Sequence, residues 1–145
     1  MFNVAYPATF KRDENGWYLV GFPDFPRSHT DGPSLNEAME EAIDCVGSSI
    51  SLAISHKEEI PKPSALKRGQ KFVPVPFWIA GKLALYWAIR EKGMSQSELA
   101  RRLGVRETVV RRMLDPAHDT RPEKLQAALE ALGKRLVLSY GDAAA

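Results

Sequence analysis

Apolar and polar residues alternate with a period of two near the start of the chain and recur every three to four residues later, which predicts strands followed by helices. Residues 2–11 alternate in this way, residues 13–16 end in Asn-Gly, and residues 17–22 are rich in aromatic and β-branched side chains. A strand, an Asn-Gly turn and a second strand are typical of a β-hairpin. A short strand over residues 27–31 is expected next.

A long helix is predicted after these strands. Ser34 and Glu37 have the spacing of a capping box, and apolar residues then recur at steps of three and four. The apolar stripe of this helix is expected to cover one face of the sheet. Residues 58–69 contain two prolines and a Lys-Arg-Gly turn, so they are expected to form a loop. Residues 71–75 predict one more strand, whose proline indicates an edge strand or a strand end.

Shorter helices are predicted over the second half of the chain. Their ranges are residues 77–92, 95–103, 106–114 and 120–132. Ser95 and Glu98 have capping-box spacing, and so do Thr120 and Glu123. Residues 135–140 alternate again and are expected to form a final short strand.

This pattern predicts an α+β protein with two domains, residues 1–76 and residues 77–145. The net charge of +2 conceals an uneven distribution. Residues 1–60 carry four basic and ten acidic side chains, a net charge of −6, whereas residues 61–145 carry sixteen basic and eight acidic side chains, a net charge of +8. The basic half suits a nucleic-acid backbone, and the acidic half suits a basic protein partner. A solvated acidic surface without a partner is the alternative.

The segment from Ser95 to Leu114 has the pattern of a helix-turn-helix. Its apolar anchors are Leu99, Leu103, Val105, Val110 and Met113. Ala100 is small enough for close helix crossing, and Gly104 stands where the turn favours a positive φ. The residues expected to contact DNA are Ser95, Gln96, Arg106, Glu107, Thr108, Arg111 and Arg112.

These residues have different expected roles. Thr108, Arg111 and Arg112 can reach base edges in the major groove. Gln96 and Arg106 suit the phosphate backbone, as do the free N–H groups at the start of the first helix. Glu107 is left open, because a carboxylate near phosphates is unfavourable unless it reads cytosine or orients an arginine.

Other classes of protein are less well supported. No apolar stretch of 18 residues is present, so no membrane span is expected. Cys45, the one cysteine, cannot form an internal disulfide, which fits the cytoplasm, and it is expected to be a buried structural thiol. No metal or cofactor is indicated. A two-metal nuclease needs converging carboxylates, and the first predicted strand has none.

Five segments of the N-terminal half are distinctive in their order and spacing: YPATF, GWYLVGFPDFP, HTDGPSLNEAMEEA, IPKPS and KFVPVP. Together they resemble antitoxins of the HicB family. The following helix-turn-helix resembles the Cro/Xre-type domain that one branch of this family carries. The resemblance implies a partial RNase H-like β-β-β-α-β domain that clamps a small basic HicA-type toxin, an enzyme that cleaves mRNA. It also implies that the C-terminal domain dimerises and represses the shared operon by binding double-stranded operator DNA.

The toxin is expected to approach Asp24 and Asp31, because the acidic half could offset its positive surface. The main alternative is a free-standing helix-turn-helix regulator with an N-terminal ligand-sensing domain, and the neighbouring reading frame would distinguish the two. The predicted strand over residues 135–140 could pair across a homodimer, which is favoured, or join the N-terminal sheet. A tetramer formed through the N-terminal domains is a further alternative.

Overall fold

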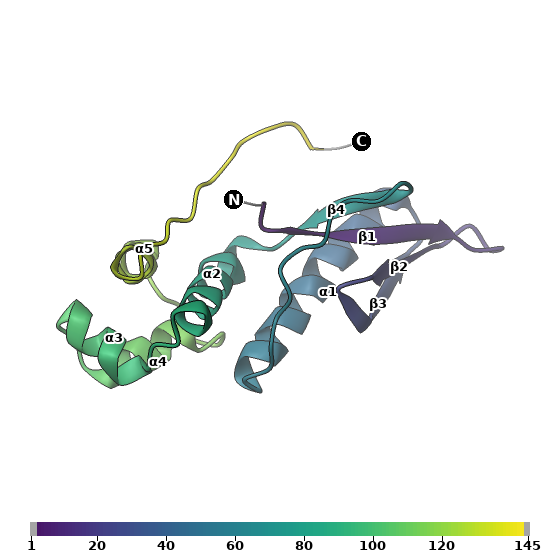
Figure 1. Cartoon of the computed structure of the whole chain (residues 1–145). Coiled ribbons are helices and arrows are strands. Elements are labelled where there is room, and N and C mark those ends of the chain that lie inside the picture. The colour runs from purple at the N-terminus through teal and green to yellow at the C-terminus, as the bar shows by residue number, and fades with distance from the viewer. Residues whose placement is uncertain (1–2, 144–145) are drawn as a thin grey trace. The chain divides into compact units, whose positions relative to one another are not determined.

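A computed structural model describes residues 3–143 and divides the chain into two compact units, with the division between Ala80 and Gly81. The first unit is an antiparallel sheet with one long helix, and the second unit is helical (Figure 1). The predicted α+β class is therefore confirmed. Phe2, the first residue of the predicted N-terminal strand, lies outside the described residues.

The sheet of the first unit has four antiparallel strands in the order β3-β2-β1-β4. They are β1 (Ala5–Arg12), β2 (Tyr18–Phe22), β3 (Phe25–Gly32) and β4 (Gln70–Pro74). The predicted hairpin is confirmed as β1 and β2, and the carboxylate of Asp13 accepts the backbone N–H groups of Asn15 and Trp17 in its turn. β4 is an edge strand that ends at its proline, as predicted.

The helix α1 (Leu35–Ser55) covers one face of this sheet, and its closest packing is against β3 (Figure 1). The Ser34 hydroxyl accepts the backbone N–H of Glu37, which confirms the predicted cap. The buried side chains of the helix and sheet include Tyr6, Pro7, Ala8, Val20, Phe22, Ala38, Ala42, Val46, Ile50, Ala53, Ile54 and Val73. Close contact between α1 and β3 depends on Gly32, since a Cβ there would lie 2.4 Å from the backbone nitrogen of Ala38.

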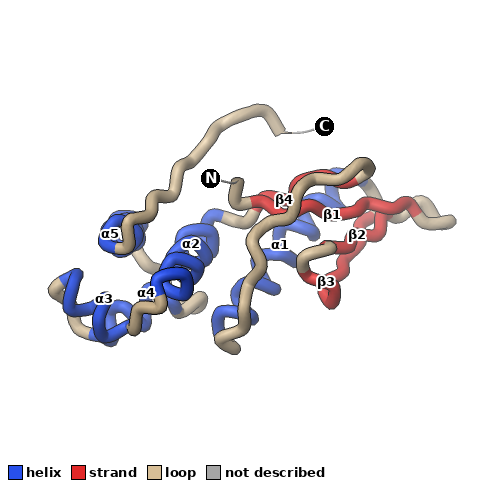
Figure 2. Tube along the Cα trace, viewed as in Figure 1, coloured by secondary structure: helices blue, strands red, loops and turns tan. Residues whose placement is uncertain are grey.

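Figure 2 shows the loop between α1 and β4 in tan. Hydrogen bonds join this loop to the rest of the first unit at two points. The Tyr6 hydroxyl donates to the carbonyl oxygen of Pro61 at 2.6 Å. The carboxylate of Asp24 accepts both the backbone N–H and the hydroxyl of Ser64, each at 3.0 Å. Burial, together with the nearby Asp24 charge, raises the pKa of Tyr6 well above its usual value, so this hydroxyl stays protonated and able to donate.

The second unit includes most of the helix α2 (Phe77–Lys92), followed by α3 (Gln96–Leu103), α4 (Glu107–Leu114) and α5 (Pro122–Ala131). Its buried core consists of Leu85, Ala88, Leu99, Ala100, Val110, Met113, Ala128, Leu129 and Leu132. Gly93 and Gly104 end α2 and α3 with positive φ angles of 61° and 67°, as their positions predicted.

Two local predictions in this unit are wrong. Thr120 does not cap α5, because the N-cap is Arg121 without a side-chain hydrogen bond, and the Thr120 hydroxyl accepts from Lys82 instead. Val105 is not a core anchor, since 37% of it is exposed.

The predicted strand over residues 135–140 is also absent from the structure of the single chain. A strand needs a neighbouring strand for its hydrogen bonds, and the four-stranded sheet does not include these residues. Its addition to the N-terminal sheet is therefore not seen. Pairing across a dimer stays a prediction, because it requires a second copy.

We expect Gly32→Ala to destabilise the first unit by about 1–3 kcal/mol, because the added methyl group would overlap the α1 backbone. Gly21→Ala on the neighbouring strand is the control, since its Cβ would meet Thr9 at an ordinary 3.5 Å. Urea unfolding of the full chain measures both variants. Equal stability of the two variants would contradict the role given to Gly32.

Candidate nucleic-acid interface and partner surface

The outward side of α4 is polar, and with the N-cap Arg106 it carries five of the seven residues predicted to contact DNA. Arg106, Glu107, Thr108, Arg111 and Arg112 are all exposed, whereas the intervening Val110 and Met113 are buried. Thr108 is three and four residues before the two arginines, so the three side chains share one face of the helix. This face has the size and chemistry that a major groove accepts.

The helix α3 is packed behind α4 through the core of the second unit. Ser95 caps α3, because its hydroxyl accepts the backbone N–H of Glu98 at 3.1 Å. Gln96 is half-buried at the first turn, beside the Ser95 cap. The left-handed Gly104 then reverses the chain into α4. The predicted residues of the two helices thus belong to one helix-turn-helix arrangement.

Glu107 has an intramolecular partner that the sequence did not reveal. The hydroxyl of Ser97, on α3, donates to the Glu107 carboxylate at 3.0 Å. Glu107 is also the acidic residue in the first turn of α4, where negative charge stabilises a helix that begins without a side-chain cap. The carboxylate therefore joins the starts of the two helices.

The far end of α4 is fastened by Lys82 of α2. Its ammonium donates to the carbonyl oxygens of Arg112 and Met113 at 3.1 and 3.0 Å, and to the hydroxyl of Thr120 at 2.9 Å. Burial lowers the pKa of Lys82, and the charges of Asp115 and Asp119 act in the opposite direction. The sequence prediction overlooked this residue, although Lys82 is the one charged residue in the apolar run from residue 77 to 89.

The sequence prediction also omitted two exposed arginines in the last turn of α3. They are Arg101 and Arg102, and the second forms a helix-surface ion pair with Glu98 at 3.5 Å. Their signal was present in the sequence, since they directly precede the Gly104 turn. They extend the basic surface next to α4.

The two structural units differ less in net charge than the two parts of the sequence before and after residue 60. Residues 1–80 carry eight basic and ten acidic side chains, a net charge of −2, and residues 81–145 carry twelve and eight, a net charge of +4. The difference arises because Lys62, Lys67, Arg68 and Lys71 belong to the first unit. The acidic character of this unit is therefore local rather than general.

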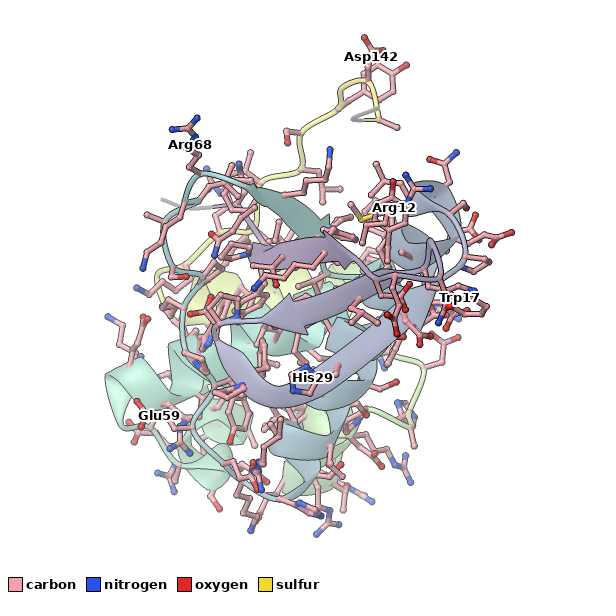
Figure 3. All side chains as sticks on the ribbon, turned by 90° about the vertical axis from the view of Figure 1, so that its right-hand side faces the viewer. Arg12, Trp17, His29, Glu59, Arg68 and Asp142 are labelled. Carbon is pink, nitrogen blue, oxygen red and sulfur yellow. The ribbon has the colours of Figure 1, made fainter. Side chains whose placement is uncertain are left out.

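Much of this local acidity lies on α1 and β3. The exposed carboxylates of α1 are Glu37, Glu40, Glu41 and Asp44. Asp31 is exposed on β3, the edge strand on which Figure 3 labels His29. Asp24 is the last residue of the β2–β3 turn and is half-buried, and one of its carboxylate oxygens accepts hydrogen bonds from Ser64. The structure thus leaves Asp31 open to a partner, while Asp24 has a role within the fold.

Chemistry of other kinds finds little support in the described part of the chain. Cys45 is half-buried, its Sγ faces the backbone oxygen of His29 at 3.9 Å, and burial raises its thiol pKa. Within residues 3–143, no group of three or more His, Cys, Asp or Glu side chains could hold a metal ion. Over the same residues, no helix is long and apolar enough to cross a membrane.

Comparison with known proteins assigns a family to each part of the chain. The family described as "HicB_like antitoxin of bacterial toxin-antitoxin system" matches residues 5–84, and the family described as "Helix-turn-helix" matches residues 85–138. Neither is an enzyme family.

Curated relatives match over nearly the full length. Antitoxin HicB 2 of Photorhabdus laumondii is 38% identical over 136 residues, covering 94% of this chain and 96% of the relative. Antitoxin HicB of Escherichia coli K12 is 36% identical over 135 residues, covering 93% and 98%. Antitoxin HicB of Pseudomonas fluorescens is 34% identical over 128 residues, covering 88% of each chain.

Proposed function

Because the chain belongs to the HicB-like antitoxin family of bacterial toxin–antitoxin systems, we propose that it neutralises a HicA-type toxin and represses its own operon. The first unit binds the mRNA-cleaving toxin, and the second unit binds operator DNA as a homodimer. The observation that carries this proposal is the presence, on one chain, of an antitoxin unit and a helix-turn-helix with an exposed basic face on α4. A free-standing ligand-sensing regulator does not account for the antitoxin unit.

Operator binding follows from the two faces of α4. The buried face fixes the helix on the core, and the exposed face offers Thr108, Arg111 and Arg112 to the bases. Gln96 and Ser95 at the start of α3, together with Arg106, serve the phosphate backbone. Glu107 is engaged by Ser97, so we assign it to holding the helices rather than to reading cytosine.

Toxin binding is assigned to the edge of the sheet next to α1. Asp31 and the acidic side chains of α1 are exposed there and suit a positive protein surface. The hydrogen bonds from Ser64 to Asp24 join the adjacent turn to the loop, and a contact surface ordered before binding loses less entropy on association. Asp24 therefore contributes to the toxin surface mainly by holding its shape.

Dimerisation is assigned to the chain after Lys134. The start of this segment is tied to α2 by the Lys134–Glu91 ion pair at 2.9 Å, and Leu136 packs against the core. Beyond it, Val137, Leu138 and Tyr140 are 61%, 72% and 103% exposed. A second copy that pairs with this segment as a strand would bury these apolar side chains and supply the missing hydrogen bonds. A two-fold symmetric dimer would present two copies of α4, as an operator with two half-sites about 34 Å apart requires.

We expect Arg111→Ala to weaken operator binding by about 1–3 kcal/mol, because it removes a base contact. Arg106→Ala should weaken binding to all duplexes alike and lower the salt dependence by about one phosphate contact. Arg121→Ala, exposed at the start of α5, removes the same charge outside the interface. Fluorescence anisotropy at several salt concentrations measures all three variants. An equal effect of Arg111→Ala and Arg121→Ala would exclude the proposed base contact.

We expect Asp31→Lys to reduce toxin affinity by roughly tenfold or more, because it places a positive charge against a positive surface. Glu14→Lys in the β1–β2 turn is the matched charge reversal, and it should leave affinity unchanged. Calorimetry with the toxin encoded beside this chain, followed by a growth assay, tests both variants. Unchanged binding and neutralisation by Asp31→Lys would remove this edge from the toxin surface.

We expect truncation after Leu136 to convert the dimer to a monomer, because it removes the exposed strand-forming residues but keeps the contacts of Lys134 and Leu136. Truncation after Tyr140 serves as the control and should stay dimeric. Light scattering gives the mass of each form and distinguishes a tetramer. A dimer that survives truncation after Leu136 would place the interface elsewhere.

A further inference from the structure

Lys82 is a buried cation in the middle of a helical unit. Its side chain is 3% exposed, and among residues 3–143 no other charged residue is buried. An ammonium group has three N–H donors and accepts nothing. All three donors are used, since the group binds the carbonyls of Arg112 and Met113 and the hydroxyl of Thr120. A group with this burial and these partners has one defined position.

Two of the three acceptors belong to the end of α4. The last four carbonyl groups of a helix have no partner within the helix, and they carry the negative end of its dipole. Arg112 and Met113 are among the last three residues of α4. The Arg112 carbonyl also accepts from the backbone N–H of Asp115 and the Thr120 hydroxyl, and Lys82 adds a positively charged donor from a different helix.

The apolar core alone leaves the position of α4 along its axis less well defined. Val110 and Met113 fix how deeply α4 is buried, but apolar contacts have little directional preference. Hydrogen bonds to a charged donor are directional and short. A shift of one residue along a helix amounts to about 1.5 Å and a rotation of about 100°. Such a shift would carry Thr108 and Arg111 away from their base edges.

We propose that Lys82 is a positioning residue for DNA recognition, which sets the axial position and rotation of α4 from inside the core. The proposal rests on the function proposed above, in which α4 reads the operator. Lys82 is too buried to reach DNA, so it acts through α4 alone. The hydrogen bond to Thr120 also holds the connection between α4 and α5 in place. Asp115 and Asp119 of this connection lie near the ammonium charge.

The variant Lys82→Met tests this role, because methionine replaces the four-atom apolar stem of the side chain but lacks the ammonium group and its three donors. The variant buries no charge, and it leaves the three oxygen atoms without this donor, which is the change that the test requires. Lys124→Met is the matched control, since Lys124 is exposed in the first turn of α5. Each variant loses one positive charge from the same unit.

The measurement uses the full chain and two duplexes. One is a sequence that the wild-type chain enriches from a random duplex library, and the other is an unrelated duplex of equal length. Lys82→Met should lower affinity for the selected duplex at least tenfold more than Lys124→Met does. Its affinity for the unrelated duplex and its salt dependence should stay at the wild-type values, because no phosphate contact is lost.

Other outcomes overturn the proposal. Equal affinity losses on both duplexes would show a general effect of charge or folding, and wild-type affinity for the selected duplex would show that α4 does not need Lys82. If Lys82→Met does not fold, the variants Thr120→Val and Thr120→Ser test the proposal instead, because Thr120 provides one of the three acceptors of Lys82. The valine variant should lose affinity for the selected duplex several-fold and the serine variant should retain it, whereas wild-type affinity in a folded Thr120→Val would contradict the proposal. If the wild-type chain enriches no duplex, DNA binding itself fails, and this result is separate from the role of Lys82.

Discussion

The ammonium group of Lys82, held in the core by three oxygen atoms, joins α2 to the end of α4 and to the connection that follows it. A buried charge without partners would be very unfavourable, so the surrounding chain must keep these oxygens in place. This hydrogen bonding also affects the surface of the unit. The backbone carbonyl of Arg112 accepts from Lys82, while the guanidinium group of the same residue is exposed. The interior of the unit and its exposed recognition face are thereby linked through one residue.

The first unit is organised by a different constraint, which is close backbone packing. Gly32 allows the backbone of β3 to pack closely against the backbone of α1. The loop after α1 is held to the sheet by Tyr6 and Asp24, one hydroxyl donor and one carboxylate acceptor. In the proposed function the toxin contacts this edge, and a surface held by such hydrogen bonds loses less entropy on association.

Local signals in the sequence were sufficient for much of this architecture. The caps at Ser34 and Ser95 and the left-handed Gly104 were predictable because each depends on a few neighbouring residues. The exposed face of α4 followed from helical spacing. The cap predicted at Thr120 was wrong, although Thr120 and Glu123 have the same spacing as the two correct caps. The Thr120 hydroxyl instead accepts a hydrogen bond from Lys82, which lies 38 residues earlier in the chain.

The sequence by itself determined the order of the elements, their inward and outward faces, and the resemblance to an antitoxin with a helix-turn-helix. These properties depend on periodicity and on short motifs, which act over one or two turns of chain. Only the tertiary structure decided which polar groups meet: Glu107 with Ser97, Asp24 with Ser64, and Lys82 with the end of α4. Such pairs depend on how elements far apart in the sequence pack against each other. The spacing of residues along the chain does not give the distance between two side chains on different elements.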